Sequence, residues 1–342
     1  MKRYGNLFDK IASVENIQLA HKNASKGKKH YDEVKMVNSN IEHYSQEISK
    51  MLHEGRFENS KYKVFTKLDK GKEREIYKLP YYPDRIVHHA IMQVLEPIWI
   101  KTLIPDTFQS IKGRGMHKAK KRIEPVVRSG KVKYCLKLDI QKFYPSIDNQ
   151  ILQGIIEKKI KCKRTLQLLN KVLYSIEGVP IGNYLSQYFG NLYLTYFDHW
   201  IKEELKVKYY YRYCDDIVLL SNTKPELHTV LGRIKVYLDD SLKLRIKKDY
   251  QVFDIRRGVD FLGFRFFIRY TLIRKRIAKS FIGACKVFIK SKDSNKLITL
   301  VSYYGWVKSA DGYNLWKTYK NRVESGIPVG YETNTKLIRG KL

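Results

Sequence analysis

The sequence predicts an α+β fold in which helices alternate with antiparallel strand pairs. Apolar residues recur at helical spacing in "YPDRIVHHAIMQVLEPIW", residues 82–99. Polar and apolar residues instead alternate around a tight turn in "KYKVFTKLDKGKEREIYKLP", residues 61–80, and in "YYYRYCDDIVLL", residues 209–220. A helix period and a strand period in neighbouring segments are typical of a mixed fold.

The chain carries far more positive than negative charge. Its 342 residues include 66 Lys and Arg against 34 Asp and Glu, a formal net charge of +32. Such an excess repels itself unless a polyanion balances it. With 26 tyrosines available to stack on bases, nucleic acid is favoured over an acidic membrane surface or a merely solvated basic face.

Length and composition bound the remaining possibilities. A 43% hydrophobic content over 342 residues is enough for a core divided among two or three subdomains. The four cysteines show no CxxC spacing, which argues against a zinc site or a disulfide framework. No run of about 18 apolar residues and no signal-peptide pattern is present, so we expect a cytoplasmic protein without membrane contact.

Three elements precede the centre of the chain. Residues 1–60 read as helices with a basic stretch, "KNASKGKKH". A hairpin with cations near its tip follows, and Pro83 is expected to open the next helix, where adjacent His88 and His89 point too far apart to share one metal ion. In "SIKGRGMHKAKKRIEPVV", a glycine pair precedes a lysine-rich helix, so Lys112, Arg114 and Lys118 are candidate phosphate ligands, although an ordinary loop would look similar.

Three later segments carry the candidate chemistry. "YCLKLDIQKFYPSID", residues 134–148, predicts a buried strand that ends at Asp139. "GVPIGNYLSQYFGNLYL", residues 178–194, predicts a glycine-rich bend followed by a core-facing helix. The alternation in residues 209–220 puts Asp215 and Asp216 at a hairpin bend.

Two aspartates on a hairpin tip and a third on a neighbouring strand suit Mg²⁺, which prefers oxygen ligands. A pair of such ions about 4 Å apart supports phosphoryl transfer to a 3′-hydroxyl group. Taken alone, Asp-Asp between strands is more often a solvated turn. All three segments in this order favour a metal site, with two Mg²⁺ ions for which Mn²⁺ can substitute.

The chain resembles the reverse transcriptase family, with "LKLDIQKFYPSID" as motif A, "GVPIGNYLSQ" as motif B and "YCDD" as the motif C box. The resemblance extends from about residue 70 to 265 and implies a right-hand polymerase with fingers, a palm built on an antiparallel sheet, and a helical thumb. The implied segments are an N-terminal helical extension at 1–60, fingers at 61–131, palm at 132–150, connecting helices at 151–178, palm again at 179–265, and thumb at 266–342. Template RNA, a primer or cDNA strand and dNTPs are the implied partners.

The same resemblance implies roles for individual residues. Asp139 and Asp215 would be the main metal ligands, with Asp216 as the weaker carboxylate beside them and Ile140 contributing its backbone carbonyl. Lys247 or Lys248, in the motif D segment "LRIKKDY", would protonate the leaving pyrophosphate. Two further groups are implied: Lys72 and Arg74 for the triphosphate, and Phe261, Leu262 and Gly263 of "FLGF" for the primer grip.

Motif B gives a closer resemblance. Most reverse transcriptases have Gln-Gly three residues before Ser-Pro, whereas this chain has Ile181-Gly182 and ends the motif in Ser186-Gln187. The pattern IGxxxSQ resembles the reverse transcriptases of diversity-generating retroelements, which copy a template RNA with errors opposite adenine and have a small basic ring-forming accessory protein as partner. An alkyl side chain at Ile181 would give contact with the incoming nucleotide but no orienting hydrogen bond, a loss worth about 1 to 3 kcal/mol of selection, unless Ile181 only packs under the palm.

Tyr144 stands five residues after Asp139, where RNA-dependent RNA polymerases have a second aspartate that accepts from the ribose 2′-hydroxyl. An aromatic ring there fills the space of that hydroxyl, which favours dNTPs, although Tyr144 could instead be a core residue. The aromatic run from Tyr303 to Lys308, with Trp316, would either follow a duplex or form the seam of a helical bundle. The alternatives for the whole chain are a defence-associated or group II intron-like reverse transcriptase, or a non-catalytic RNA-binding protein on the same fold.

Overall fold

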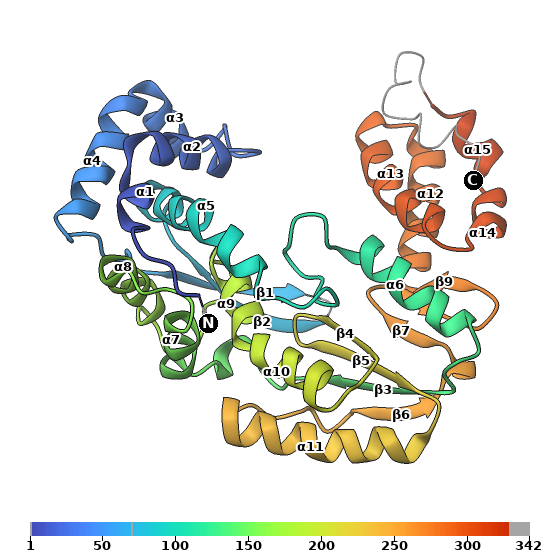
Figure 1. Cartoon of the computed structure of the whole chain (residues 1–342). Coiled ribbons are helices and arrows are strands. Elements are labelled where there is room, and N and C mark those ends of the chain that lie inside the picture. The colour runs from blue at the N-terminus through green and yellow to red at the C-terminus, as the bar shows by residue number, and fades with distance from the viewer. Residues whose placement is uncertain (1, 70, 328–342) are drawn as a thin grey trace. The chain divides into compact units, whose positions relative to one another are not determined.

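The computed structural model describes residues 2–69 and 71–327, with the side chains of Asp69 and Lys72 outside that description. Contacts divide the chain into two compact units, whose segments can be followed by colour in Figure 1. The first unit comprises Met1–Lys112, Leu138–Lys208 and Val230–Asp249, and the second comprises Gly113–Lys137, Tyr209–Thr229 and Tyr250–Leu342. Each unit is therefore assembled from segments far apart in the sequence. The six segments expected from the sequence stay predictions.

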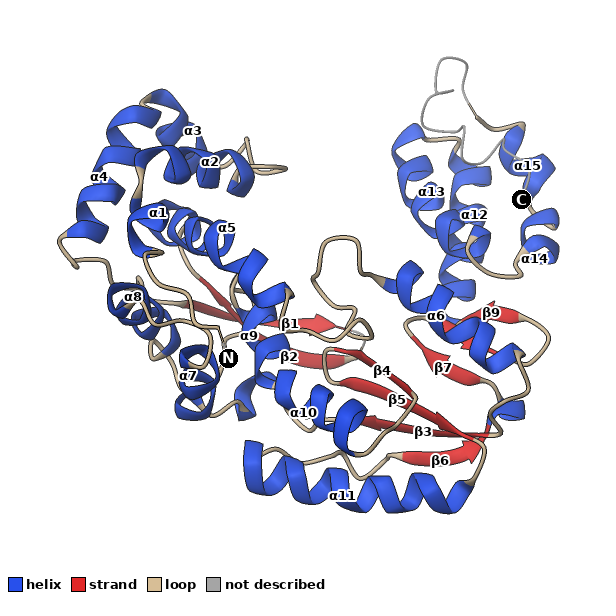
Figure 2. Cartoon of the chain, in the orientation of Figure 1, coloured by secondary structure: helices blue, strands red, loops and turns tan. Residues whose placement is uncertain are grey.

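Helices and short strands alternate along the chain, as Figure 2 shows by colour. The α-helices are α1 Phe8–Ala12, α2 Val14–Ala24, α3 Asp32–Ser39, α4 Ile41–His53, α5 Ile86–Ile100, α6 Met116–Arg128, α7 Asn149–Glu157, α8 Lys163–Leu173, α9 Ser186–Tyr193, α10 Thr195–His199, α11 Lys224–Leu242, α12 Lys275–Ser291, α13 Ser294–Lys308, α14 Tyr313–Lys317 and α15 Lys320–Glu324. The shorter η segments, of 3₁₀ or π type, are η1 Tyr81–Arg85, η2 Tyr144–Ser146, η3 Trp200–Glu204 and η4 Ile255–Arg257. The strands are β1 Lys63–Asp69, β2 Lys72–Lys78, β3 Tyr134–Asp139, β4 Tyr209–Tyr213, β5 Asp216–Ser221, β6 Gln251–Asp254, β7 Val259–Phe261, β8 Phe264–Phe266 and β9 Thr271–Ile273. The α+β fold class is confirmed.

The N-terminal helices of the first unit pack around α5, with α2 against both α4 and α5 (Figure 1). The Ser13 hydroxyl caps α2 by accepting from the Asn16 N–H at 3.2 Å. The Asn16 side chain in turn donates to the Ala90 carbonyl of α5 at 3.1 Å. Ile17 and Ala20 of α2 are fully buried, so the apolar face and the cap fix this helical layer together.

The expected hairpin is formed by β1 and β2, in an antiparallel register that pairs Lys67 with Arg74. Leu68 of β1 is 70% exposed, so this hairpin is not held by a covering layer on that side. Lys70, in the middle of the expected turn, lies outside the described residues.

The expectation that Pro83 opens the next helix agrees with the backbone, because Tyr82 is the one residue of the segment Tyr81–Arg85 with non-helical angles. Residues Tyr81–Arg85 form a π-helical segment with an extended Tyr82, and the regular helix α5 begins at Ile86. The restriction that proline places on the preceding residue accounts for the extended Tyr82, and the missing N–H of Pro83 costs nothing in the first turn of a helix.

A four-stranded sheet has the order β4-β5-β3-β6. β4 pairs antiparallel with β5, and β3 pairs antiparallel with β6 from Tyr134 opposite Asp254. The Lys133 N–H, just before β3, donates to the carbonyl of Ser221 at the end of β5 at 2.9 Å. Cys135, Leu136 and Leu138 are at most 1% exposed, which confirms the buried strand expected there.

The second unit also contains the sheet β7-β8-β9 and the helices α12–α15. A two-residue turn of Leu262 and Gly263 joins β7 to β8, and both have positive φ angles, 54° and 84°. Tyr304 and Trp316 are buried with their ring centroids 4.6 Å apart, so they form the seam of the helical bundle rather than a surface for nucleic acid. Residues 328–342 of the predicted thumb lie outside the described residues.

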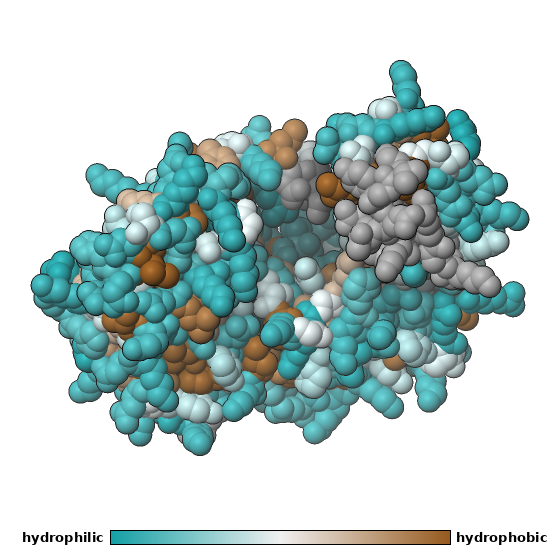
Figure 3. Space-filling model, turned by 90° about the horizontal axis from the view of Figure 1, so that it is seen from above, coloured by the Kyte–Doolittle hydropathy of each residue, from teal (hydrophilic) through white to brown (hydrophobic). Residues whose placement is uncertain are grey.

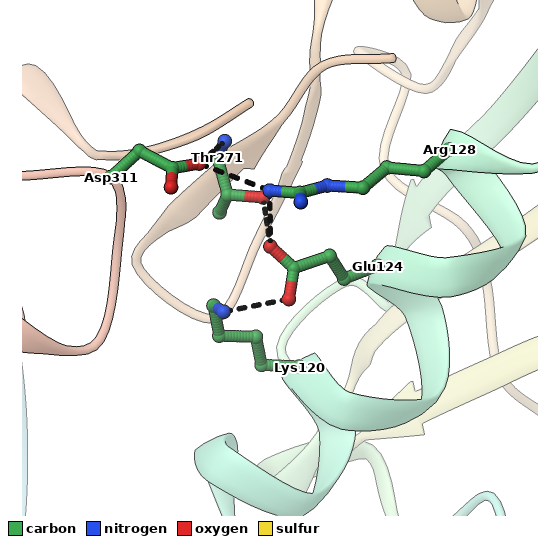
Figure 4. A network of polar contacts seen from close by, with 5 residues as sticks. All are labelled: Lys120, Glu124, Arg128, Thr271 and Asp311. Carbon is green, nitrogen blue, oxygen red and sulfur yellow. Dashed lines mark hydrogen bonds and ion pairs between the residues drawn. The ribbon is translucent and has the colours of Figure 1, made fainter. Parts of the chain in front are cut away.

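A polar network joins α6 to β9 and to the loop after α13 (Figure 4). Glu124 accepts hydrogen bonds from Lys120 at 2.7 Å, Arg128 at 2.9 Å and the Thr271 hydroxyl at 2.6 Å. Asp311 accepts from Arg128 at 3.0 Å and from the Thr271 N–H at 2.7 Å. These charge-assisted bonds fix the lysine-rich helix within its own unit.

Hydrophilic residues cover most of the face shown in Figure 3, with small apolar groups between them. In the described residues, no helix combines the length and the apolar character that crossing a membrane requires.

Candidate active site

The double-aspartate hairpin separates its two carboxylates. Tyr213 pairs with Asp216, so Cys214 and Asp215 form the two-residue turn and Asp216 is the first residue of β5. The expectation that both aspartates lie on the bend is therefore corrected for Asp216. Cys214 has a left-handed φ of 58°, which costs a non-glycine residue about 1 kcal/mol. Backbone strain of this kind is typical of functional turns.

Two cationic side chains that the sequence analysis did not single out support this hairpin. Arg212 of β4 is fully buried and donates to the Cys214 carbonyl at 3.2 Å. The ammonium group of Lys137, on β3, lies 3.8 Å from Asp216 Oδ1 and donates to the Asp260 carbonyl at 2.7 Å. The signal for Lys137 was its place two residues before Asp139, since residues i and i+2 of a strand share a face.

Asp139, the last residue of β3, is held by the segment after α11. The Lys247 N–H donates to the Asp139 carbonyl at 2.9 Å, and the Gln141 N–H donates to the Arg245 carbonyl at 2.8 Å. Between these bonds, Ile140 and Ile246 form an antiparallel bridge. The Lys247 ammonium group contacts Asp139 Oδ1 directly.

This pairing distinguishes Lys247 from Lys248, between which the sequence could not choose a general acid. Lys247 is half-buried beside the Asp139 carboxylate, whereas Lys248, the next residue, is exposed. Neighbouring residues of an extended segment point to opposite faces, which accounts for the difference.

The predicted sugar gate lies against the glycine of α9. Tyr144 is half-buried, and its hydroxyl accepts from Gln109 Nε2 at 3.4 Å. A Cβ atom at Gly190 would lie 3.1 Å from the rings of both Phe143 and Tyr144. Gly190 therefore provides the space in which the two rings sit, and Phe143, 3% exposed, is the one that packs in the core.

The motif B bend is fixed to the β1–β2 hairpin by its backbone. The Tyr77 N–H of β2 donates to the Ile181 carbonyl at 2.8 Å. Gly182 has φ of 122°, and a Cβ there would lie 2.9 Å from the Tyr77 carbonyl, so this close approach requires glycine. Ile181 is half-buried, and Gln187 is exposed and accepts from the Ser110 hydroxyl.

The remaining predicted residues divide by exposure. Arg74 is exposed on β2 at the position opposite Lys67, while the Lys72 side chain is not among those described. Lys112 is exposed in the first unit, and the second unit holds half-buried Arg114 and exposed Lys118 around the N-terminus of α6. Of the predicted primer grip, the Phe261 side chain is fully buried, half-buried Leu262 forms the turn, and Gly263 approaches Trp306 so closely that a Cβ would lie 2.6 Å from its ring.

The carboxylates of Asp139, Asp215 and Asp216 and the Ile140 carbonyl are all oxygen donors, the kind that fits Mg²⁺. In the part of the chain that the structure describes, no three His, Cys, Asp or Glu side chains gather into a metal cluster of their own. Magnesium ions in nucleotidyl-transfer sites are held by one or two carboxylates together with substrate phosphates. Donor chemistry here fits that arrangement, in which the substrate completes the ligand set.

Comparison with known proteins identifies the family. Residues 61–266 match the family described as reverse transcriptase (RNA-dependent DNA polymerase). The chain belongs to the reverse transcriptase family. The match covers more than half of the chain and includes both the Asp139 strand and the Asp215 hairpin.

The chain is also similar to individual curated proteins. Protein YkfC of Escherichia coli K12 is 24% identical over 261 residues, which are 63% of this chain and 67% of YkfC. The group II intron-encoded protein LtrA of Lactococcus lactis subsp. cremoris is 27% identical over 143 residues, 38% of this reverse transcriptase but only 23% of LtrA.

A solved structure of apo telomerase from Candida tropicalis has the same fold with a TM-score of 0.53 at 10% identity, and the match covers 82% of this chain and 60% of the telomerase. This reverse transcriptase therefore spans about a quarter of LtrA and somewhat less than two thirds of the telomerase.

Proposed function

We propose that this reverse transcriptase copies an RNA template into DNA by transferring dNMP units to a primer 3′-hydroxyl, with Asp139 and Asp215 as the metal-holding carboxylates. The observation that carries the proposal is the sheet order. β3, which ends at Asp139, is the neighbour of β5, which begins at Asp216. This order places the end of β3 and the start of β5 at the same end of the sheet, and with them one carboxylate from each strand.

Two Mg²⁺ ions, when bound, would lower the pKa of the attacking 3′-hydroxyl and stabilise the charge on the leaving pyrophosphate. Asp139 and Asp215 would orient those ions, with the Ile140 carbonyl as a further ligand. Asp216 would act as the supporting carboxylate, because Lys137 beside it offsets part of its charge.

Lys247 is the better candidate for the general acid. Its ammonium group contacts the Asp139 carboxylate. When that carboxylate instead binds the metal ions of a substrate complex, the Lys247 ammonium group would be close enough to donate a proton to the leaving pyrophosphate. Lys72 and Arg74 of the fingers hairpin would bind the triphosphate, with Gly182 and Gln187 of the motif B bend near the nucleotide. Tyr144 would exclude the 2′-hydroxyl of ribonucleotides by its ring.

The nucleic-acid contacts form a separate part of the proposal. Lys112, Arg114 and Lys118 would bind template phosphates, since cations near a helix N-terminus suit an anion and Lys112 and Lys118 are exposed. Phe261, Leu262 and Gly263 would shape the primer grip, in which the left-handed turn rather than the buried Phe261 side chain meets the strand.

A finer proposal is that synthesis is error-prone at template adenines and serves a diversity-generating retroelement, with a small basic ring-forming protein as partner. Its support is Ile181, whose main chain is held by Tyr77 while its side chain offers no hydrogen bond to a nucleotide. A group II intron-like role is the second candidate, which the match to LtrA favours.

Primer extension on a defined RNA template with Mg²⁺ tests the proposal. Wild type and Asp215→Asn are compared with dNTPs and with NTPs, and the products are sequenced. Extension with dNTPs that Asp215→Asn abolishes is the expected result, and errors concentrated opposite adenine would support the retroelement role over the intron-like one. A folded protein that binds template and extends no primer, with or without a partner, would overturn the catalytic role in favour of RNA binding.

A further inference from the structure

A small pocket in the first unit lies apart from the carboxylates already described. It has a volume of about 190 Å³ and opens between the loop before α3, the end of β2, the start of α5 and the motif B bend. Its charged and polar lining includes Lys28, Lys78, Arg85, His88 and Glu33. Drug-sized ligand sites are about 300 to 1,000 Å³, so this pocket has room for a small group rather than a whole nucleotide.

Two residues that line the pocket each have a buried side-chain nitrogen without a hydrogen-bond partner among the described residues. His88 is 2% exposed, and its Nε2 has no acceptor or donor among the described residues. Arg85, one helical turn earlier, has a buried Nε in the same condition. A buried polar group without a hydrogen-bond partner is destabilising, so a ligand that pairs either nitrogen would bind more tightly.

The charge of the pocket selects the kind of ligand. Lys28, Lys78 and Arg85 supply three cations against the single carboxylate of Glu33. That carboxylate is already engaged, because both of its oxygens accept from the Tyr81 N–H, at 3.1 and 3.2 Å. Partial burial, and then the nearby charge of Arg85, lower the pKa of Lys28.

His88 adds a neutral hydrogen-bonding group to these cations. Burial, with the charges of His89 and Arg85, lowers the pKa of His88 to about 3, so the imidazole is uncharged at neutral pH. A neutral imidazole can donate from Nε2 in one of its tautomers. An oxyanion with several acceptor oxygens satisfies this donor and the Arg85 guanidinium at once.

We propose that this pocket, lined by Arg85, His88 and Lys28, binds one phosphate group. The motif B residues Gly182 and Tyr184 complete its wall, one and three positions after Ile181. Given the proposed function, on which this step rests, the phosphate belongs to an RNA strand and not to a free nucleotide. The site is distinct from the triphosphate position assigned to Lys72 and Arg74.

Binding can be measured without any synthesis. Protein labelled with ¹⁵N-histidine is titrated with inorganic phosphate, with dimethyl phosphate, with dNTP and with a short single-stranded RNA, and His88→Gln identifies the His88 signal. We expect a saturable shift of that signal with phosphate and with RNA. No shift with any of the four probes would overturn the proposal, and a shift with free phosphate or dNTP but not with RNA would overturn the assignment to a strand.

A matched pair of surface variants guards against misfolding. Lys28→Glu places a carboxylate at the pocket, whereas Lys29→Glu makes the same charge change at the next, exposed residue. We expect RNA binding by Lys28→Glu to be about tenfold weaker than by Lys29→Glu, the size of one lost charge-assisted hydrogen bond. Equal affinities of the two variants would contradict the proposal.

These readouts separate the pocket from the catalytic proposal. The Asp215→Asn variant should give the same His88 shift as wild type, because its pocket is intact. If the His88 shift is retained in a protein that makes no DNA, the pocket proposal holds and the catalytic proposal fails. If an active enzyme shows no His88 shift, the catalytic proposal holds and the pocket proposal fails.

Discussion

Lys247 holds Asp139 in two ways: its N–H donates to the Asp139 carbonyl at 2.9 Å, and its ammonium group contacts the carboxylate. A single residue therefore fixes both the main chain and the charge at the end of β3. This double contact gives the motif D segment a defined position beside the predicted metal ligand, and it leads to the first prediction.

Lys247→Arg should lower the rate of primer extension about 100-fold or more, because arginine keeps the charge but is a poor proton donor. The matched control is Lys248→Arg, whose exposed side chain lies on the other face and should leave the rate within about twofold. Single-nucleotide incorporation measured from pH 6 to 9 checks both variants. A rate for Lys247→Arg equal to that of Lys248→Arg would show that only the positive charge matters.

Asp215→Asn should reduce nucleotide incorporation about 100- to 1,000-fold, the cost of removing one group that stabilises charge in a transition state. Asp216→Asn should cost less, because Lys137 already offsets part of that carboxylate's charge. Incorporation rates measured over a range of Mg²⁺ concentrations test the ranking, and a larger loss at Asp216 would exchange the roles of the two aspartates.

Tyr144→Ala should raise ribonucleotide incorporation relative to dNTP incorporation about tenfold or more, because it opens the space of a 2′-hydroxyl. Phe143→Leu serves as a control, since Phe143 is 3% exposed and lies in the core. Competing dNTP and NTP in single-nucleotide extension gives the ratio directly, and an unchanged ratio for Tyr144→Ala would return this residue to a purely structural role.

Gly263→Ala should destabilise the second unit by about 2 to 4 kcal/mol, because φ is 84° and the new methyl would lie 2.6 Å from the Trp306 ring. Gly283→Ala, in the exposed interior of α12 with open space around it, should instead stabilise by about 0.5 to 1 kcal/mol. Urea unfolding of both variants compares them, and equal midpoints would rule out the close contact at Trp306.

The network in Figure 4 predicts a pH dependence of stability. Burial of Glu124 raises its pKa, but hydrogen bonds from Lys120 and Thr271, with the charges of Lys120 and Arg128, outweigh burial and hold the pKa below its ordinary value. The resulting stability is present above the unfolded-state pKa of about 4.3 and is lost as the pH falls through the lower folded-state pKa.

The Glu124→Gln variant should therefore be less stable than wild type at pH 6, and the difference should shrink as the pH falls toward 3. Thermal unfolding at intervals of half a pH unit measures this convergence. A constant difference across the range would mean that the charge of Glu124 is not what the network uses.

The sequence by itself determined the elements that carry the candidate site. Alternation of apolar residues predicted the strand that ends at Asp139, and the aromatic and apolar runs on either side of Asp215 predicted its hairpin. The spacing of apolar residues in 178–194 predicted a core-facing helix, and Phe189 and Leu192 of α9 are each 3% exposed. Local periodicity records burial and element type, which are properties of neighbouring residues in the chain.

Only the tertiary structure decided which side chains meet. The choice of Lys247 over Lys248 follows from the pairing of Ile140 with Ile246, residues that lie far apart in the sequence. Lys137 reaches Asp216 because β3 and β5 are neighbours in the sheet, and His88 lines a pocket together with residues of the motif B bend. Periodicity shows which face of an element is buried, but the partner across that face is set by long-range packing and strand register.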